Sequence, residues 1–389
     1  MIRRLTPPPH PSFLGLPLEL RQHIYEEMLQ LPARDHISLL CVCKQTFSEG
    51  KDQFYRRPLN CNSQDALDLF ALGHAPETLQ QIKTLNVRFQ EVDSTVMQPV
   101  LALLVAGPPI SSRQHPYFHE IEKVTRSLAS MPTVRNLSIL RPVGQLQNPP
   151  SRDFFESICS WVHENYRQLQ SLSISVENTS LGFLRCLRNL RMLSFSGFSA
   201  TQPEELLNIL SQLGHLEELK IIGPFHGFRR RQRYGYQHRF VVQSFTDAVL
   251  RGMRPLKSLT VCEVSVPTHD EPSFLTEDVL EALYMTHRDS LRELSVLSET
   301  PLDHSVDSLL RAFLMSTPML TKLSVGWPEM DVSFFDSLPT TLRQLEVGIS
   351  DISFRQPVMD RLNSLDDRLR HLRSINLTGS MRTINSGPL

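Results

Sequence analysis

The chain has 389 residues and carries 40 lysines and arginines against 41 aspartates and glutamates, so its formal net charge is −1 at pH 7. This balance excludes a protein whose whole surface is built to bind nucleic acid or an acidic membrane. The six cysteines show neither the paired spacing of a zinc site nor that of a disulfide framework, so we expect free thiols in a reducing compartment, the cytosol or the nucleus.

Residues 1–11 are rich in proline and predict a disordered leader. They contain no apolar run that could act as a secretory signal. The longest apolar run in the chain, residues 96–110, is interrupted by three prolines and is too short to span a bilayer. We therefore expect a soluble protein with no membrane partner.

Residues 12–57 predict a small helical module. Pro17 suits the first turn of a helix, and Leu20, Ile24 and Met28 follow at helical spacing behind Leu16. This spacing predicts an outward face made of Glu19, Arg21, Gln22, Glu26 and Glu27. A second helix is expected over residues 36–49, and its inner side would carry one of two sets: Ile37, Leu40 and Phe47, or Leu39, Val42 and Cys43.

Two segments of this module resemble the F-box, in the variant found in fungal proteins. They read Leu16-Pro17-x-Glu19-Leu20-Arg21-x-x-Ile24-Tyr25 and Leu39-Leu40-x-Val42-Cys43-Lys44-Gln45, with Glu49 after the second. Many F-boxes have a tryptophan three positions after the cysteine, where this chain has Thr46 followed by Phe47.

The F-box resemblance implies docking on the Skp-type adaptor of a cullin-RING ubiquitin ligase. The residues that would contact the adaptor are Leu16, Pro17, Leu20, Ile24, Leu39, Val42, Cys43 and Lys44. A bundle this small has a core that is marginal on its own, so a partner could complete its burial. The alternative is that the apolar members of this set are the internal core of the bundle.

Residues 58–80 predict a helical connection that covers the first repeat of the array described next, because the end of such an array is otherwise an open apolar surface. The helix is expected over residues 65–72, where Ala66, Leu67, Leu69 and Phe70 recur.

Residues 81–378 contain ten copies of one short pattern, apolar-x-x-Leu-x-apolar. The central positions are Leu85, Leu137, Leu172, Leu193, Leu219, Leu259, Leu294, Leu323, Leu345 and Ile375. The residue that follows each of them is polar in all ten copies, which is the period of a strand with one buried face. The intervening segments carry helical periodicity, so each repeat is one strand plus one helix, and stacked repeats share one core.

This recurrence resembles the irregular leucine-rich repeat. The resemblance implies an α/β solenoid with parallel strands on its concave face and helices on its convex face. Helices are expected over residues 96–105, 119–129 and 153–166, and further helices are expected to begin at Thr201, Thr276 and Asp303.

The polar residues of the ten strands form a grid on the open face, because neighbouring strands lie about 4.8 Å apart. We expect Lys220, Ser295, Ser324 and Glu346 of this grid to contact a substrate. The surface is chemically mixed, which suits a folded protein or an extended peptide rather than a small metabolite.

Residues 225–240 hold five arginines among aromatic side chains. Arg229, Arg230, Arg231 and Arg233 could bind an acidic or phosphorylated substrate segment, because guanidinium groups pair with carboxylate and phosphate in bidentate geometry. The stretch also fits a nucleic-acid patch or a nuclear import signal. The plainest alternative is an exposed, mobile loop kept soluble by its charge.

No nucleotide-binding loop, nucleophile elbow or zinc-protease motif occurs, so we expect no catalysis, cofactor or metal. The two resemblances together imply a substrate-recognition subunit of a Skp–cullin–F-box ubiquitin ligase that binds a protein substrate, and neither nucleic acid nor a small molecule. The alternative is a leucine-rich-repeat scaffold without a ligase role, associated with nucleic acid through the Arg-rich loop. Residues 379–389 are expected to form a disordered tail.

Overall fold

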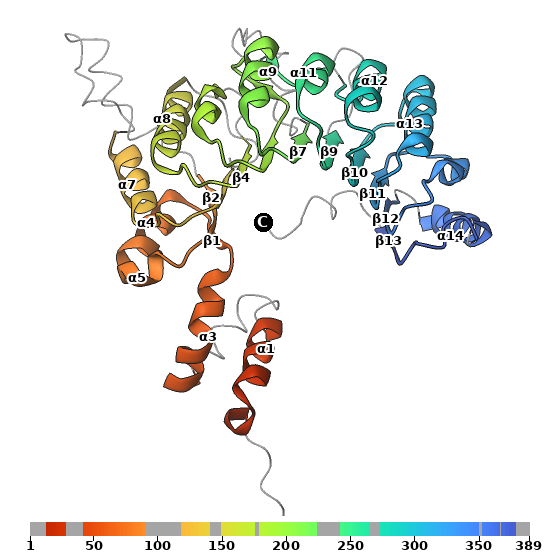
Figure 1. The fold of residues 1–389 in the computed structure, drawn as a ribbon. Coiled ribbons are helices and arrows are strands. Elements are labelled where there is room, and N and C mark those ends of the chain that lie inside the picture. Colours follow the sequence, from red (N-terminus) through yellow and green to blue (C-terminus); the bar gives the residue numbers. More distant parts are fainter. Residues whose placement is uncertain are drawn as a thin grey trace, which may run out of the picture.

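The computed structural model describes residues 13–28, 42–89, 118–140, 149–175, 179–223, 242–263, 273–349, 352–365 and 367–378. Within them, eleven parallel strands form one sheet in the order β1-β2-β3-β4-β5-β7-β9-β10-β11-β12-β13. Figure 1 shows a curved array with the strands along its inner side and the helices along its outer side. The α/β class and the long parallel sheet agree with the architecture that the repeat pattern predicts.

The strands are short and evenly spaced along the sheet. Their bounds are β1 (Leu59–Cys61), β2 (Thr84–Arg88), β3 (Asn136–Leu140), β4 (Ser171–Ile174), β5 (Met192–Phe195), β7 (Glu218–Ile222), β9 (Ser258–Glu263), β10 (Glu293–Ser298), β11 (Lys322–Gly326), β12 (Gln344–Gly348) and β13 (Ser374–Thr378). A separate antiparallel pair is formed by β6 (Phe198–Ser199) and β8 (Val242–Gln243).

The helices alternate with these strands. They are α1 (Leu18–Met28), α3 (Lys44–Arg56), α4 (Gln64–Gly73), α5 (Pro76–Leu79), α7 (Phe118–Ala129), α8 (Pro149–Asn165), α9 (Pro203–Gln212), α11 (Asp247–Gly252), α12 (Glu277–Thr286), α13 (His304–Ser316) and α14 (Arg355–Ser364). Short 3-10 turns are η1 (Phe13–Gly15), η3 (Gly182–Cys186), η4 (Val332–Ser337) and η5 (Ile352–Phe354). The helix expected over residues 96–105 lies outside the described residues.

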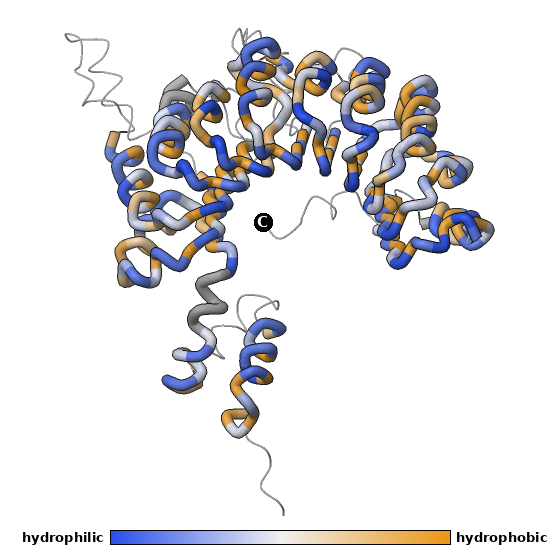
Figure 2. Tube along the Cα trace, viewed as in Figure 1, coloured by the Kyte–Doolittle hydropathy of each residue, from blue (hydrophilic) through white to orange (hydrophobic). Residues whose placement is uncertain are grey.

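The ten predicted strands are confirmed as neighbours in register. Leu85 aligns with Leu137, and Leu294 aligns with Leu259 on one side and Leu323 on the other. The central leucines from β2 to β12 are buried in one continuous core, whereas Ile375 on the terminal strand β13 is 38% exposed. Figure 2 shows hydrophobic residues recurring along the strands and along the helices that cover them. Each leucine fully buried in this way contributes roughly 1.5–3 kcal/mol to folding.

The backbone just before each strand is held by a repeated pair of hydrogen bonds. The Lys83 carbonyl oxygen accepts from the N–H groups of Arg135 (2.8 Å) and Asn136 (2.9 Å). The carbonyl oxygen of Arg135 accepts in the same way from Gln170 (2.7 Å) and Ser171 (3.0 Å), and the pattern continues to β13. These bonds align the residues that precede the strands in a straight row, here named the rim row: Lys83, Arg135, Gln170, Arg191, Glu217, Lys257, Arg292, Thr321, Arg343 and Arg373.

The connection expected over residues 58–80 differs from its prediction. The expected helix is present as α4, but the segment opens with a strand, β1, whose Leu59 and Cys61 align with Leu85 and Val87 of β2. The repeat pattern did not reveal this strand because Arg56 stands where the pattern requires its first apolar residue. The sheet therefore begins one repeat earlier than residue 81.

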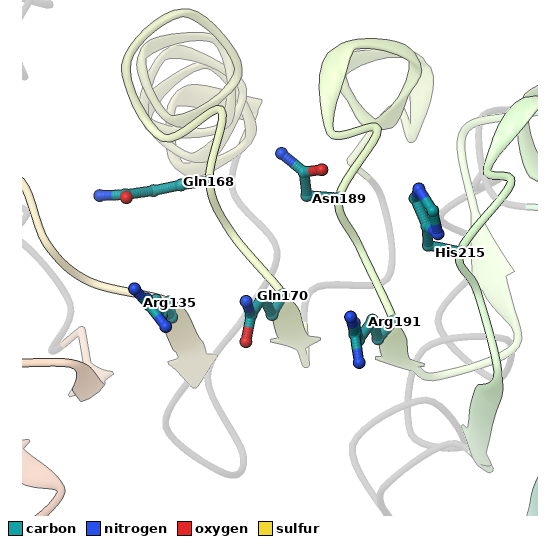
Figure 3. Close-up of a pocket in the computed structure, with 6 residues that line it drawn as sticks. All are labelled: Arg135, Gln168, Gln170, Asn189, Arg191 and His215. Carbon is teal, nitrogen blue, oxygen red and sulfur yellow. The ribbon is translucent and has the colours of Figure 1, made fainter.

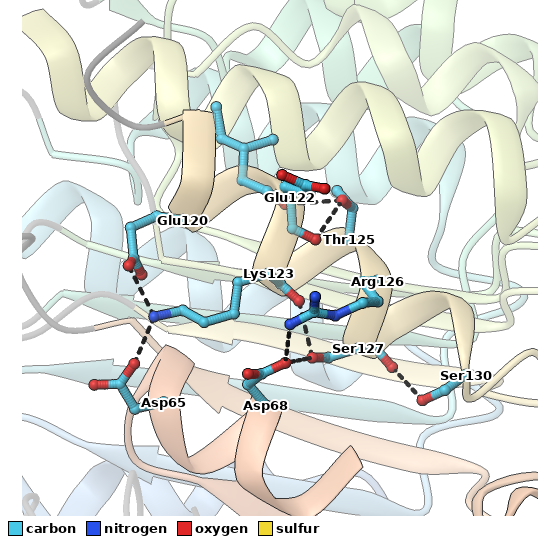
Figure 4. Close-up of polar contacts among 10 residues, drawn as sticks. Asp65, Asp68, Glu120, Glu122, Lys123, Thr125, Arg126, Ser127 and Ser130 are labelled. Atoms are coloured by element: carbon cyan, nitrogen blue, oxygen red, sulfur yellow. Dashed lines mark hydrogen bonds and ion pairs between the residues drawn. The ribbon is translucent and has the colours of Figure 1, made fainter. Parts of the chain in front are cut away.

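Helix α4 is tied to α7 by charged side chains (Figure 4). Lys123 of α7 donates from Nζ to Asp65 Oδ1 (2.5 Å) on α4 and to Glu120 Oε1 (2.8 Å) on its own helix. Asp68 Oδ1 of α4 accepts from Arg126 Nη2 and from Ser127 Oγ, both at 3.0 Å. These contacts fix α4 on the array as the helix of the first repeat.

The starts of the later helices follow their predictions in part. Thr276 caps α12 by accepting from the Val279 N–H at 3.3 Å, as its position predicts. Thr201 does not cap α9, because its Oγ1 accepts from the Leu181 N–H (2.7 Å) and so joins two repeats. Asp303 is the N-cap of α13 but makes no side-chain cap bond.

Candidate interaction surfaces

Helices α1 and α3 of the N-terminal module are joined through Glu49 of α3. Its carboxylate accepts from Arg21 Nε (2.8 Å), Arg21 Nη2 (2.7 Å), the Tyr25 hydroxyl (3.1 Å) and Gln45 Nε2 (2.9 Å). Arg21 Nη1 also donates to the carbonyl oxygens of Leu14 (3.1 Å) and Leu16. This Arg21–Glu49 network brings together four residues that carry the F-box resemblance and lie up to 28 positions apart.

The inner face of α1 differs from its prediction. The helical spacing predicted Leu20 inside and Arg21 outside, but Arg21 is 8% exposed, Tyr25 is 1% exposed and Leu20 is 52% exposed. The Arg21 guanidinium can be buried without a large desolvation penalty, because most of its N–H groups donate to the Glu49 carboxylate or to backbone carbonyl oxygens. A bidentate pair with a distant residue therefore outweighs the apolar stripe in orienting this helix.

Of the helix expected over residues 36–49, the described part begins only at Lys44, where α3 (Lys44–Arg56) starts. Val42 and Cys43 precede it rather than lie on its inner side. The Cys43 N–H donates to Thr46 Oγ1 (3.2 Å), and this hydroxyl donates to the Cys43 carbonyl oxygen (2.9 Å). Residues 36–41 of the predicted helix, including Leu39, lie outside the described residues.

The network shifts the pKa values of its members. The hydrogen bonds from Arg21, and then from Gln45, lower the pKa of Glu49 to about 2. Burial, followed by the bond to Glu49, raises the pKa of Tyr25 to about 12. At neutral pH the pair is therefore a carboxylate and a neutral phenol, which is the state that the hydrogen bonds require.

The outer surface of the module carries exposed apolar side chains among its charged ones. Leu20 and Val42, two of the predicted adaptor contacts, are 52% and 69% exposed, so neither belongs to an internal core. Of the other predicted contacts, Leu16, Ile24 and Cys43 are half-buried, and Pro17 and Lys44 are exposed. Leu14, Leu18 and Phe47 extend the same exposed apolar set, here named the module patch: Leu14, Leu18, Leu20, Val42 and Phe47. The motif did not single out these three, although Leu18 lies within it and Leu14 and Phe47 lie two residues from a motif position. Phe47, one of the residues offered for the inner side of the second helix, is 48% exposed.

The polar grid of the concave face exists as predicted. Thr260 aligns with Lys220 and Ser295, and Ser324 aligns with Ser295 and Glu346, so the four candidate substrate contacts lie in one row. Lys220 is exposed, and Ser295 and Glu346 are half-buried.

Ser324 is a correction to the predicted substrate contacts, because it is 4% exposed and its hydroxyl has no hydrogen-bond partner within the described part of the chain. Side chains converge on the inner side of a curved sheet, so a short one is covered by longer neighbours. Here the Lys322 ammonium and the Glu346 carboxylate lie 4.0 Å apart beside it.

The middle of the concave face carries three carboxylates among the basic side chains Lys220, Lys257 and Arg292. Glu217 in the rim row accepts from Lys257 Nζ at 2.6 Å, and this bond lowers the pKa of Glu217. Burial, and then the like charges of Glu293 and Glu217, raise the pKa of the neighbouring Glu218. Three carboxylates therefore gather between β7 and β10, a concentration that the sequence alone did not reveal.

A polar cavity of about 290 Å³ opens at the start of strands β3 to β5. Figure 3 shows its six lining side chains in two rows. Arg135, Gln170 and Arg191 come from the rim row, and Gln168, Asn189 and His215 come from the turns two residues earlier. No acidic side chain lines this cavity. The strand pattern does not point to it, since all six residues precede the strands.

The Arg-rich loop, with Arg229, Arg230, Arg231 and Arg233, lies outside the described residues, so its role stays a prediction. The strand that follows it, β8, pairs with β6, and the Ser199 and Ser244 hydroxyls are 2.6 Å apart beside this pair. Just after β8, the N–H groups of Ser244 (2.9 Å) and Phe245 (3.1 Å) donate to the carbonyl oxygen of Gly197, whose φ of 81° lies in the left-handed region.

The described ranges contain no group of three or more His, Cys, Asp or Glu side chains that could hold a metal ion. Among the same residues, every helix is too short or too polar to cross a lipid bilayer.

Comparisons with known proteins show weak likeness in structure only. No protein-family model and no curated protein sequence matches the chain. Among solved structures, the chain is similar to one titled a TLR13–ssRNA13 complex (12% identity, TM-score 0.34), covering 85% of this chain and 41% of that one. It is also similar to one titled a Rad7 and Elc1 complex in yeast (12% identity, TM-score 0.32), covering 85% of this chain and 88% of that one. The chain thus spans less than half the length of the first of these proteins.

Proposed function

We propose that the chain is a non-catalytic substrate-recognition subunit of a cullin-RING ubiquitin ligase of the Skp–cullin–F-box kind. Its helical module would bind the Skp-type adaptor, and its repeats would bind the protein to be ubiquitinated. On this proposal the chain works in the cytosol or the nucleus, needs no cofactor, and contributes proximity between substrate and conjugating enzyme rather than chemistry.

The module patch is the observation that carries the proposal. Its five side chains are at least 40% exposed, while the inner face of the same module is held by the polar Arg21–Glu49 network. Burying one such side chain against a partner contributes roughly 1.5–3 kcal/mol, so five of them support a stable complex. An apolar patch that a small module leaves open marks an interaction site.

The resemblance to the F-box identifies the partner in this proposal. Leu20 and Val42 belong both to the motif and to the module patch. Arg21, Tyr25, Gln45 and Glu49, which complete the resemblance, hold α1 against α3 so that the patch is presented on one unit. The motif thus divides into residues that build the module and residues that face outward.

The repeats fit the substrate-binding half of the proposal. Their concave face carries a row of polar and charged side chains, which suits a protein surface or an extended peptide. Lys220, Ser295 and Glu346 are the contacts that we propose in this row, and Ser324 is not one of them.

The test is the association of the purified full chain with a purified Skp-type adaptor. Leu20→Glu combined with Val42→Glu is expected to weaken association by at least about 10-fold, because two charges would enter an apolar interface. Leu69→Glu combined with Leu72→Glu is the matched control, since these leucines are 72% and 68% exposed on α4, outside the module. No association with the intact chain would instead favour a leucine-rich-repeat scaffold without a ligase role.

A further inference from the structure

The rim row is strongly basic. Seven of its ten residues are lysine or arginine, one in most repeats, and all seven are exposed: Lys83, Arg135, Arg191, Lys257, Arg292, Arg343 and Arg373. The hydrogen bonds of their backbone carbonyl groups hold them at the spacing of the strands, about 4.8 Å per repeat. The charges therefore form a line along one edge of the sheet.

The section of this line from β2 to β5 is free of acidic side chains. Its rim residues are Lys83, Arg135, Gln170 and Arg191, and the face positions beside them are Thr84, Asn86, Asn136, Ser138, Ser171, Ser173, Met192 and Ser194. The section ends at β7, where Glu217 and Glu218 are the first carboxylates along the row.

The cavity described above lies within this section. Arg135 and Arg191 line it from two sides of Gln170, and His215 adds a third basic group. Neither guanidinium makes a side-chain hydrogen bond or ion pair within the described ranges, in contrast to Lys257, which is bonded to Glu217. The charge of Arg191 does reach Glu217, whose pKa it helps to lower. Guanidinium groups with free N–H donors beside amide side chains are suited to carboxylate, because they form charge-assisted hydrogen bonds with it.

We infer that the rim from β2 to β5 binds an extended, carboxylate-rich segment of a partner protein, with one carboxylate in the cavity between Arg135 and Arg191. This inference rests on the proposed function, for which it names a class of substrate. Arg135 precedes β3 and Arg191 precedes β5, so their backbones are separated by two strand spacings, roughly 10 Å. An extended peptide rises about 3.3 Å per residue. Acidic residues three positions apart would therefore match them.

The same surface lacks what single-stranded nucleic acid requires. Sequence-tolerant binding of bases depends on exposed aromatic rings beside the positive groove. The most exposed rings among the described residues are Phe47, Phe118 and Tyr284, which lie on α3, α7 and α12 rather than on the rim. The distributed charges and the amides favour a peptide.

The experiment measures binding of the full chain to a labelled peptide of about 12 residues with glutamate at every third position, long enough to cross β2 to β5. Arg135→Gln combined with Arg191→Gln is expected to weaken binding by about 10-fold or more, since two charge-assisted contacts are lost. Arg343→Gln combined with Arg373→Gln, at the same row position near β12 and β13, is the matched control and is expected to change binding less than about 2-fold.

Equal weakening by both double variants, or equal binding of a peptide with glutamine in place of glutamate, would overturn the inference. It would also be overturned if a single-stranded oligonucleotide of the same charge displaced the peptide at lower concentration and depended on the same two arginines. The variant that combines Arg135→Gln with Arg191→Gln is expected to associate with the adaptor as the unaltered chain does. If the intact chain associates with the adaptor but does not bind the peptide, this inference alone is refuted. If it binds the peptide but does not associate with the adaptor, only the ligase role is refuted.

Discussion

His287 joins two repeats from inside the core, and replacing it should destabilise the array. Its side chain is fully buried, its Nδ1 accepts from the Leu256 N–H (3.0 Å), and its Nε2 therefore carries the proton that it donates to the Leu250 carbonyl oxygen (3.0 Å). His287→Ala leaves the buried Leu256 N–H without a partner, whereas the Leu250 carbonyl oxygen keeps its bond from the Met253 N–H (3.3 Å). One unpaired buried group costs roughly 1–3 kcal/mol, so we expect a loss of about that size in the free energy of unfolding.

The pH dependence of stability should change with the same replacement. Burial lowers the pKa of His287 below 6.5, against a smaller raising effect from the bond to Leu250. Because the folded state then binds fewer protons than the unfolded state, stability falls as the pH drops below about 6.5. The His287 variant should lose this part of the dependence.

Urea unfolding followed by circular dichroism between pH 5 and 8 measures both effects. His215→Ala is the control, because His215 is exposed in the rim cavity, and its effect should stay within about 0.5 kcal/mol. A loss below about 1 kcal/mol for His287→Ala, or an unchanged pH dependence, would refute the assignment of a neutral cross-linking histidine.

Three further predictions concern the core, one turn and the module. Leu294→Ala should lower the free energy of unfolding by about 3–5 kcal/mol in urea, whereas Ile375→Ala, at the same repeat position on the half-covered terminal strand, should cost about 1 kcal/mol. Gly197→Ala should lower the thermal midpoint, because φ is 81° and the added Cβ would lie 2.5 Å from the Phe274 ring. Glu49→Gln should weaken adaptor association measured at pH 7. In the unaltered chain, ionised Glu49 stabilises the folded module above pH about 4.5, and this stabilisation is lost as the pH falls towards about 2. Circular dichroism of the helices in the variant and in the unaltered chain measures the difference.

Each of these has a result that contradicts it. Equal costs for the Leu294 and Ile375 replacements would mean that the end of the sheet is as well covered as its middle. An unchanged midpoint for Gly197→Ala would mean that the Phe274 ring has room to move. Normal adaptor association with Glu49→Gln would separate the Arg21–Glu49 network from docking.

The leucine positions made the sheet predictable from the sequence. A residue such as Leu294 appears in a pattern of period two, and that pattern reports which face of a strand is buried. The first strand did not match because Arg56 occupies the first apolar position of the pattern, three residues before Leu59, although Leu59, Asn60 and Cys61 keep the alternation. The three-residue pattern Leu-x-apolar matches this strand, but so short a pattern also matches many segments that are not strands.

The polar residues were harder to place because their positions depend on partners and on curvature. The helical spacing predicts Arg21 on the outward face of its helix, yet the bond to Glu49, 28 positions later in the chain, holds its side chain inward. Ser324 was assigned to the right face, but its exposure depends on how closely the neighbouring side chains converge. The rim row shows in the sequence as a basic residue after the first apolar position of most repeats. The alternation within strands does not report it, because these residues precede the strands.

A repeat array separates stability from recognition along its length. Each repeat contacts chiefly its neighbours, so a change at Arg135 or Arg191 in the rim should leave the repeats near Arg343 and Arg373 unaffected. The basic section at β2 to β5 and the carboxylates at β7 to β10 follow one another along the same surface. A partner segment with acidic residues at one end and basic residues at the other would meet both in only one direction. The order of charge along the array can therefore set the direction in which a substrate lies. Exchanging the acidic and basic halves of such a peptide should weaken its binding while its composition stays constant.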